Sequence, residues 1–322
     1  MNRRDFLCGA TCLMAGFALG KMQDKKSPHK GSEEASSNRN NEDELGILIA
    51  VSSHCNLNCK GCHTFSPLAE QEFVTFEQFE KDFRKLKEIL GNSDYCLMNY
   101  SGGEALLNPE LEKIMELSVK LFPKGDKALS TNAILLEKKN EDFYKLLKRN
   151  NIHIFITKYP INIDRSKYEN LAKKYNIELT YDQVNSNKLF LLETKEPIND
   201  IYREIGFKWG KPTLDLEGNQ KPIEKQHICP HRGITTYARG NLYACYTHAF
   251  INAFIDYFKV DIPITEDDYL KIENINDKKE IFDFLNKPKP LCRYCKYCHN
   301  TCYGYDAVDW DFSKKEISEW TE

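Results

Sequence analysis

The sequence predicts an α/β fold: a partial (β/α)6 TIM-like barrel with a small cysteine-rich C-terminal extension. Apolar strand-like runs alternate with amphipathic helical segments between residues 46 and 185, and seven of the 12 cysteines fall into two tight groups. Such alternation implies parallel strands joined by right-handed crossovers. Because five βα units are readable, with a sixth candidate strand at residues 188–192, we expect an incomplete barrel.

The individual elements follow from local patterns. Residues 46–52 form an apolar run typical of a strand buried on both faces. Thr75 is a candidate N-cap for a helix to about residue 90, because apolar residues recur at helical spacing from Phe76. Asn108-Pro109 predicts the start of the next helix, since proline is favoured in a first turn. Further strands are expected over residues 95–100, 127–131, 152–157 and 177–181, and further helices over 142–149 and 166–175.

The N-terminal residues are expected to lie outside the folded core. Residues 1–22 combine a basic start, a short apolar stretch and a polar follow-on, which are the features of an export signal. Arg3-Arg4 before Phe-Leu resembles a twin-arginine signal, and a membrane-associating start is the alternative. Residues 23–44 are almost wholly polar and predict a disordered linker. We expect no stable transmembrane span in the mature core.

Composition excludes some classes of partner and of cysteine chemistry. The formal net charge is −3 and both signs are interspersed, so we expect no nucleic-acid partner. Cysteines clustered within a dozen residues suit a metal centre better than disulfides, which usually join distant segments. Cys96 stands alone in an apolar run and is expected to be a small buried hydrophobic residue.

The first cysteine group, Cys55, Cys59 and Cys62, follows directly after the first predicted strand. Three thiolates can bind three irons of a [4Fe–4S] cube and leave the fourth iron open to a non-protein ligand. The glycine and asparagines between the cysteines tolerate the tight curl that this requires. A zinc site is the alternative, with His54 or His63 as a fourth ligand.

The Cys55-x3-Cys59-x2-Cys62 spacing and its place after the first strand resemble the signature of the radical S-adenosylmethionine (SAM) superfamily. Gly61 stands where that family often carries an aromatic residue. The resemblance implies an enzyme with a [4Fe–4S] cluster and SAM as cofactors and an electron donor such as flavodoxin or ferredoxin. In that chemistry SAM is cleaved reductively, and a 5′-deoxyadenosyl radical abstracts hydrogen from the substrate.

Polar motifs at the ends of the next strands extend the resemblance. The Ser-Gly-Gly-Glu segment at 101–104 matches the family's Gly-Gly-Glu motif, whose carbonyls, and sometimes the Glu, contact the SAM amino group. The segment at 130–132 resembles the family's ribose-proximal motif, with helix capping as the alternative. Lys158 and Tyr159 are candidates for the SAM carboxylate or the substrate, or else belong to a solvated turn. The expected cofactor-binding residues are Ser101, Gly102, Gly103, Glu104, Ser130, Asn132 and Lys158.

The C-terminal cysteines predict a second metal centre. Cys229 and Cys245 resemble the opening of the SPASM or twitch extension that follows many radical SAM cores. A run of four cysteines with the bacterial ferredoxin spacing comes next. We expect one auxiliary [4Fe–4S] cluster, with structural zinc as the alternative. The candidate ligands are Cys229, Cys245, Cys292, Cys295, Cys298 and Cys302.

These features divide the chain into a radical SAM core at residues 45–220 and an auxiliary-cluster part at 221–322. The resemblance implies a peptide/protein or sugar-type substrate, and no residue pattern identifies it or a catalytic side chain. Two alternative functions remain. An iron–sulfur electron-transfer protein would explain the cysteines but not five βα units, and a zinc-stabilised binding module without catalysis would explain the cysteines alone. The cofactor chemistry favours the cytoplasm, whereas the N-terminus favours export or membrane association.

Overall fold

The computed structural model describes residues 45–91, 93, 96–182, 208–209, 213–228, 235–296 and 308–321. Several predictions lie outside these residues: the export signal and linker at 1–44, the sixth strand at 188–192, and Cys229, Cys298 and Cys302. Among the described helices, none combines the length and apolar character that a membrane crossing requires.

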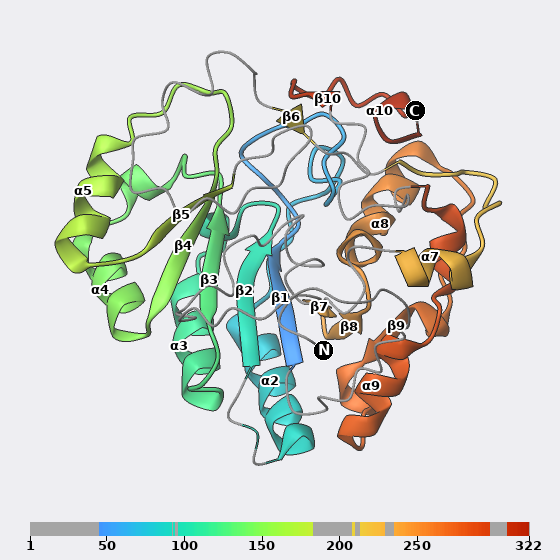
Figure 1. The fold of residues 1–322 in the computed structure, drawn as a ribbon, viewed down its shortest axis with the longest axis horizontal. Coiled ribbons are helices and arrows are strands. Elements are labelled where there is room, and N and C mark those ends of the chain that lie inside the picture. The colour runs from blue at the N-terminus through green and yellow to red at the C-terminus, as the bar shows by residue number, and fades with distance from the viewer. Residues whose placement is uncertain are drawn as a thin grey trace, which may run out of the picture.

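Eight strands form the main sheet: β1 (Leu45–Ser52), β2 (Cys96–Gly102), β3 (Lys127–Thr131), β4 (Ile152–Thr157), β5 (Leu179–Asp182), β7 (Thr235–Ala238), β8 (Asn241–Tyr243) and β9 (Tyr269–Lys271). Their order is β5-β4-β3-β2-β1-β7-β8-β9 (Figure 1). β1 to β5 are parallel neighbours, and β7 pairs in parallel with the other edge of β1. Among the described residues of this sheet, the antiparallel pairs are β7–β8 and β8–β9. The predicted α/β class, with an open, mostly parallel sheet, is confirmed.

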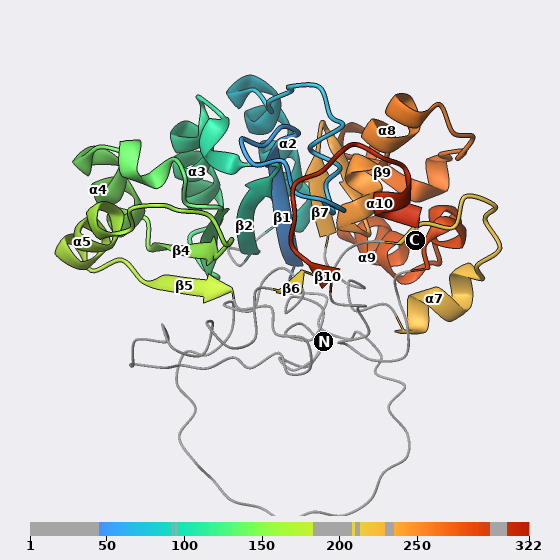
Figure 2. The ribbon, with the colours of Figure 1, turned by 90° about the horizontal axis from the view of Figure 1, so that it is seen from above.

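Four crossover helices cover one face of the parallel strands (Figure 2): α2 (Phe76–Leu90), α3 (Leu111–Leu121), α4 (Glu141–Arg149) and α5 (Ser166–Tyr175). Thr75 caps α2 as predicted, since its side chain accepts a hydrogen bond from the Gln78 amide. α3 begins at Leu111, shortly after the predicted start at Asn108-Pro109. Asn108 Oδ1 accepts from the Glu110 amide at 2.8 Å, and the Asn108 amide donates to the Val51 and Val74 carbonyls, at 2.8 and 2.9 Å.

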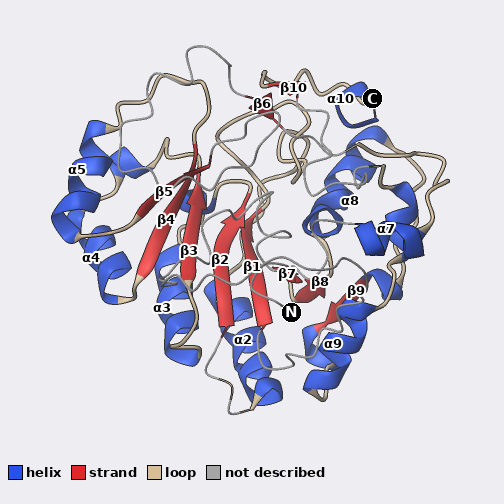
Figure 3. Ribbon diagram, in the orientation of Figure 1, coloured by secondary structure: helices blue, strands red, loops and turns tan. Residues whose placement is uncertain are grey.

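The remaining elements come mostly from the C-terminal third. The helices are α7 (Pro222–Ile228), α8 (Tyr246–Phe258), α9 (Lys278–Asn286) and α10 (Ser318–Thr321). Short 3-10 turns are η1 (Ala105–Leu107), η2 (Leu136–Lys138), η3 (Glu266–Asp268), η4 (Ile272–Asn274) and η5 (Pro290–Tyr294). A small antiparallel sheet pairs β6 (Lys208–Trp209) with β10 (Val308–Asp309). Figure 3 shows that strands β7–β9, from beyond residue 220, continue the sheet of the predicted core.

β1 lies between two hydrophobic cores, and all eight of its residues are buried. Ile47 and Ile49 belong to the core that contains the buried faces of α2–α5. Leu48 and Ala50 face a second core, built largely from α8 with Phe65 and Trp320. The predicted strand buried on both faces is therefore confirmed, and its carboxyl end is fixed from two sides.

Candidate cofactor site

The cysteine loop leaves the carboxyl end of β1, the edge at which parallel sheets bind ligands. Cys59 is buried, Cys55 and Cys62 are half-buried, and all three are free thiols. Gly61 has φ of 60°, a left-handed conformation that a glycine adopts without strain. This backbone angle accounts for a glycine where the family often has an aromatic residue.

Burial makes the Cys55 and Cys59 thiols hard to ionise without a cationic partner. It is the main cause that raises the pKa of Cys55, and the negative charges of Glu104 and Cys62 raise it further. Burial, followed by the Cys62 charge, raises the pKa of Cys59 to about 12. Iron ions supply the positive charge that would hold such thiols as thiolates. The donor set therefore fits an iron–sulfur cluster.

Hydrogen-bond donors are already arranged around two of the sulfurs. The Leu57 amide donates to Cys55 Sγ at 3.3 Å, and the Asn132 side-chain amide lies 3.6 Å from the same sulfur. Cys62 Sγ is 3.2 Å from Thr64 Oγ1, where either atom can donate. N–H and O–H groups directed at cluster sulfurs stabilise their negative charge.

Glu104 links the ends of β2 and β3 beneath this loop. Its carboxylate is 1% exposed and accepts hydrogen bonds from the Thr131 hydroxyl at 2.7 Å and the Asn132 amide at 2.9 Å. It also accepts from the Leu106 amide at 3.1 Å. Burial raises the pKa of Glu104, although these three donors oppose the shift. Glu104 thus positions Asn132, while its predicted contact with the SAM amino group stays a prediction.

Gly102 and Gly103 bring the cysteine loop against the end of β2. The Gly103 amide donates to the Ser52 carbonyl at 2.7 Å, and the next amide donates to the His54 carbonyl at 2.9 Å. A Cβ on Gly103 would lie 2.1 Å from the His54 oxygen, and one on Gly102 would lie 2.2 Å from the Ser52 oxygen. Both glycines are therefore required by the close backbone approach.

The other sequence-predicted residues divide into two groups. Asn132 lies at the loop, with its amide 2.8 Å from Asn56 Oδ1. Ser130 donates to Asn99 Oδ1 at 2.8 Å, a contact between β2 and β3. The Lys158 ammonium lies over the Tyr181 ring, 5.0 Å from its centroid. The structure thus brings Asn132 together with the cysteines, and shows Ser130 and Lys158 in contacts between neighbouring strands and loops.

Sequence reasoning missed two aromatic residues at this site. Tyr246, at the start of α8, donates its hydroxyl to the Gly102 carbonyl at 3.1 Å and is 3% exposed. Trp310 lies near Cys59, where its indole lowers the thiol pKa against the larger effect of burial. The position of Tyr246 directly after Cys245 was an available signal, but no local pattern connects Trp310 with a loop 250 residues earlier.

The described C-terminal cysteines are Cys245, Cys292 and Cys295, and all three are half-buried. Cys245 is the N-cap residue of α8. Cys292 and Cys295 share one turn, in which the Cys295 amide donates to the Cys292 carbonyl at 3.2 Å. Within the described ranges, no group of three His, Cys, Asp or Glu side chains is arranged around a single metal ion. Cys96 is fully buried in β2, as predicted.

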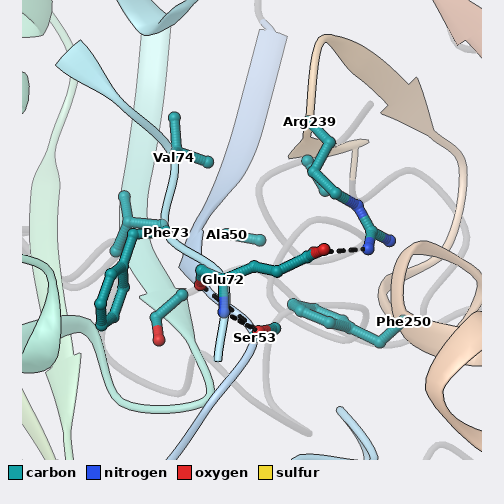
Figure 4. Close-up of a pocket in the computed structure, with 10 residues that line it drawn as sticks. Ala50, Ser53, Glu72, Phe73, Val74, Arg239 and Phe250 are labelled. Atoms are coloured by element: carbon teal, nitrogen blue, oxygen red, sulfur yellow. Dashed lines mark hydrogen bonds and ion pairs between the residues drawn. The ribbon is translucent and has the colours of Figure 1, made fainter. Parts of the chain in front are cut away.

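A pocket of about 360 Å³ opens beside the end of β1 (Figure 4). Glu72 and Arg239 form an ion pair at 3.2 Å across it, next to the Phe250 ring. The Ser53 hydroxyl accepts from the Glu72 amide at 2.9 Å. None of the described residues predicted to bind SAM or iron lines this pocket.

Residues 49–186 match the family model described as the Radical SAM superfamily. Among curated proteins, the chain is similar to GTP 3′,8-cyclase of Clostridium botulinum, with 31% identity over 111 residues. That match covers 34% of this chain and 34% of the relative. The enzyme of the same name from Staphylococcus epidermidis is 28% identical over 128 residues, 35% of this chain and 36% of its own. The chain spans about a third of the length of these relatives.

Two solved structures are similar to this chain at low sequence identity. A structure of BtrN in complex with AdoMet and 2-DOIA has a TM-score of 0.45 and 13% identity, over 78% of this chain and 92% of that one. Native anSMEcpe with bound AdoMet has a TM-score of 0.48 and 18% identity, over 81% and 88%.

The cysteine loop, its place after β1 and the family match over residues 49–186 agree with one another. Residues 49–186 therefore form a radical SAM domain, the domain of a superfamily of enzymes that use a [4Fe–4S] cluster and SAM as cofactors.

Proposed function

We propose that this chain is a radical SAM enzyme that acts on a peptide/protein or sugar-type substrate. The observation that carries the proposal is the arrangement of the cysteine loop, the glycine pair and Asn132 in hydrogen-bond contact at the ends of three parallel strands. When bound and reduced, the cluster supplies the electron that cleaves SAM to a 5′-deoxyadenosyl radical, which abstracts hydrogen from the substrate.

Cys55, Cys59 and Cys62 would hold three irons. While Ser66 donates to the Ser53 carbonyl, Thr64 donates to Ser66 Oγ, 2.6 Å away, and can accept from a Cys62 thiol. When Cys62 is a thiolate, Thr64 can turn its proton toward that sulfur if Ser66 turns its own proton toward Thr64. This chain of hydroxyls lets the loop accept either protonation state of the third sulfur.

The strand ends offer complementary groups to the amino acid part of SAM. The carbonyls of the glycine pair at 102–103 can accept from an ammonium group. The Gly102 carbonyl already accepts from Tyr246, but a carbonyl oxygen has a second lone pair. Ser101, Glu104, Ser130, Asn132 and Lys158 remain the other proposed cofactor-binding residues.

The C-terminal part is proposed to hold one auxiliary [4Fe–4S] cluster in a SPASM- or twitch-like arrangement. Its ligands would come from Cys229, Cys245, Cys292, Cys295, Cys298 and Cys302, and structural zinc remains the alternative. We also propose that residues 1–22 are a twin-arginine signal, residues 23–44 a linker, residues 45–220 the radical SAM core and residues 221–322 the auxiliary-cluster part. The proposed electron donor is of the flavodoxin or ferredoxin class.

Anaerobic reconstitution with iron and sulfide tests the proposal. We expect [4Fe–4S] absorbance, and formation of 5′-deoxyadenosine when SAM and a strong reductant are added. The triple variant C55A/C59A/C62A should lose one cluster and all SAM cleavage. C96A is the matched control, because Cys96 is a buried cysteine of β2, and it should keep both. A protein that holds only zinc under strict anaerobiosis would contradict the proposal.

The substrate is tested separately on the reconstituted enzyme. Peptides, aminoglycosides and GTP, after which the sequence relatives are named, are offered in turn with SAM. The proposal expects deuterium transfer into 5′-deoxyadenosine from a labelled peptide or sugar and none from GTP. Transfer from GTP alone would replace the proposed substrate class.

A further inference from the structure

The last described segment, residues 310–321, lies directly on the cysteine loop. Cys59 and Phe312 form an antiparallel bridge. The Lys60 amide donates to the Asp311 carbonyl at 2.9 Å, and the Ser313 amide donates to the Asn58 carbonyl at 2.9 Å. In Figure 1 this segment, between β10 and α10, passes beside the loop that follows β1. Backbone bonds on both sides of Cys59 therefore fix the loop to the C-terminal segment.

Trp320 anchors the same segment at the third cysteine. Its indole N–H donates to the Cys62 carbonyl at 2.9 Å, and its side chain is fully buried. The ring packs against Phe65 and Phe254, with centroids 6.1 and 6.2 Å apart. The segment is thus part of the second hydrophobic core, and it holds the loop at Cys59 and at Cys62.

Trp310 places an unused donor at the Cys59 sulfur. Its Nε1 is buried, and among the described residues it has no acceptor in ordinary hydrogen-bond geometry. The backbone contacts of Asp311 with Lys60 and of Phe312 with Cys59 bring the adjacent Trp310 indole to the Cys59 side chain. An indole nitrogen can only donate, and a buried donor without an acceptor is costly. Cluster-bound cysteine sulfurs accept hydrogen bonds, so a cluster held by Cys59 would give this donor an acceptor.

We propose that residues 310–320 clamp the cysteine loop, and that Trp310 is a positioning residue whose indole N–H donates to the Cys59 sulfur when that sulfur binds iron. The inference rests on the proposed function, since it takes Cys59 as a cluster ligand. Tyr159 packs against Trp310, with ring centroids 5.7 Å apart, and so holds the indole in place. Donation to a cluster sulfur stabilises the more negative, reduced state and therefore raises the reduction potential.

The test compares W310F with wild type after reconstitution. Phenylalanine keeps an aromatic ring but removes the donor. We expect a more negative midpoint potential in an EPR-monitored redox titration, and about tenfold faster loss of iron to a chelator. K314A is the control in the same segment, because the Lys314 side chain is exposed. It should behave like wild type in both measurements.

A second substitution separates the lost donor from a change of shape. Benzothienylalanine at position 310 keeps the bicyclic ring and replaces the N–H by sulfur, so it should lower the potential as W310F does. If both variants have the wild-type midpoint potential and retain iron as the wild type does, Trp310 does not donate to the Cys59 sulfur and the proposal is wrong. A wild-type chain that takes up no cluster would instead defeat the proposed function itself, so the two failures are distinguishable.

Discussion

Single atoms decide how closely the cysteine loop can approach the second strand. The hydrogen atoms on the α-carbons of Gly102 and Gly103 face backbone atoms of Ser52 and His54, where no methyl group fits. Because of this close approach, the consecutive amides of Gly103 and Glu104 donate to the carbonyls of Ser52 and His54, just before Cys55. The glycine pair was predicted from a family motif, and the structure adds a requirement from packing that is independent of SAM.

Gly103→Ala should therefore displace the loop that carries Cys55. Its Cβ would stand 2.1 Å from the His54 carbonyl oxygen, so the backbone must move, at a cost of about 1–3 kcal/mol in the free energy of unfolding. We expect a large loss of [4Fe–4S] cluster on reconstitution. Gly91→Ala is the control, because a Cβ there meets open space and only its φ of 59° is unfavourable. It should cost about 1–2 kcal/mol and keep the cluster; a full cluster content in both would contradict the argument.

The buried Glu104 carboxyl predicts a pH dependence of stability. Because burial raises its folded-state pKa above the ordinary 4.5, the folded protein binds this proton more tightly than the unfolded chain. Its contribution to stability is present below pH 4.5 and is lost as the pH rises through the raised folded value. The free energy of unfolding of the wild type, minus that of E104Q, should fall as the pH rises from about 4.5.

Glu110 serves as a control, because its pKa is shifted in the opposite direction from that of Glu104. Donation from the Phe76 amide, and next from Lys113, lowers the pKa of its exposed carboxyl. Its contribution is therefore present above the ordinary pKa and is lost as the pH falls through the depressed value. Denaturant unfolding of the reduced apo protein over a pH series should give opposite slopes for E104Q and E110Q. Equal slopes would exclude the proposed effect of burial at Glu104.

At the scale of elements, polar contacts join segments from opposite ends of the chain. The Tyr237 hydroxyl of β7 donates to Asp82 of α2 at 2.8 Å, and Gln78 donates to both oxygens of the same carboxylate. Tyr237 and Asp82 are buried, so this carboxylate depends on its donors. The contact fixes the late strand β7 against a helix formed 150 residues earlier.

Tyr237→Phe should lower the free energy of unfolding by about 1–3 kcal/mol, because it removes one donor from a buried carboxylate. The ring contacts with Phe79 and Phe83 would remain, so the loss belongs to the hydroxyl. Tyr257→Phe on α8 is the matched control; that side chain is 47% exposed, and the change should stay within about 0.5 kcal/mol. Equal unfolding midpoints for the two variants would show that the hydroxyl contributes little.

Elements that depend on local sequence were predictable. The apolar run of β1, the Thr75 cap and the helical spacing after Phe76 each act over a few residues, so their patterns survive in the sequence. The start of α3 lies a few residues after the predicted one. Asn108 Oδ1 accepts from the Glu110 amide as a capping residue does, while the Asn108 amide donates to carbonyls of β1 and of the segment before α2.

At the scale of the whole molecule, the site depends on contacts that no local pattern encodes. The cysteine spacing identified the loop, but its contacts with Trp310 and Trp320 bring together residues about 250 apart. Likewise, the pairing of β7 with β1 connects residues on either side of the division proposed at residue 220. Sequence spacing therefore predicts a chemistry for the loop, but not the distant segments that surround it.

The shared sheet predicts that residues 45–220 will not fold alone. Without β7, the edge of β1 at Ile47, Leu48 and Ile49 loses its partner strand. Without α8 and Trp320, the face of β1 that carries Leu48 and Ala50 loses the core that buries it. An unpaired edge beside an exposed apolar face favours aggregation. We therefore expect the 45–220 fragment to aggregate or to lack a cooperative unfolding transition, whereas 45–322 should unfold cooperatively by circular dichroism. A cooperative transition in the shorter fragment would show that the core is an independent domain, and that β7 to β9 only extend it.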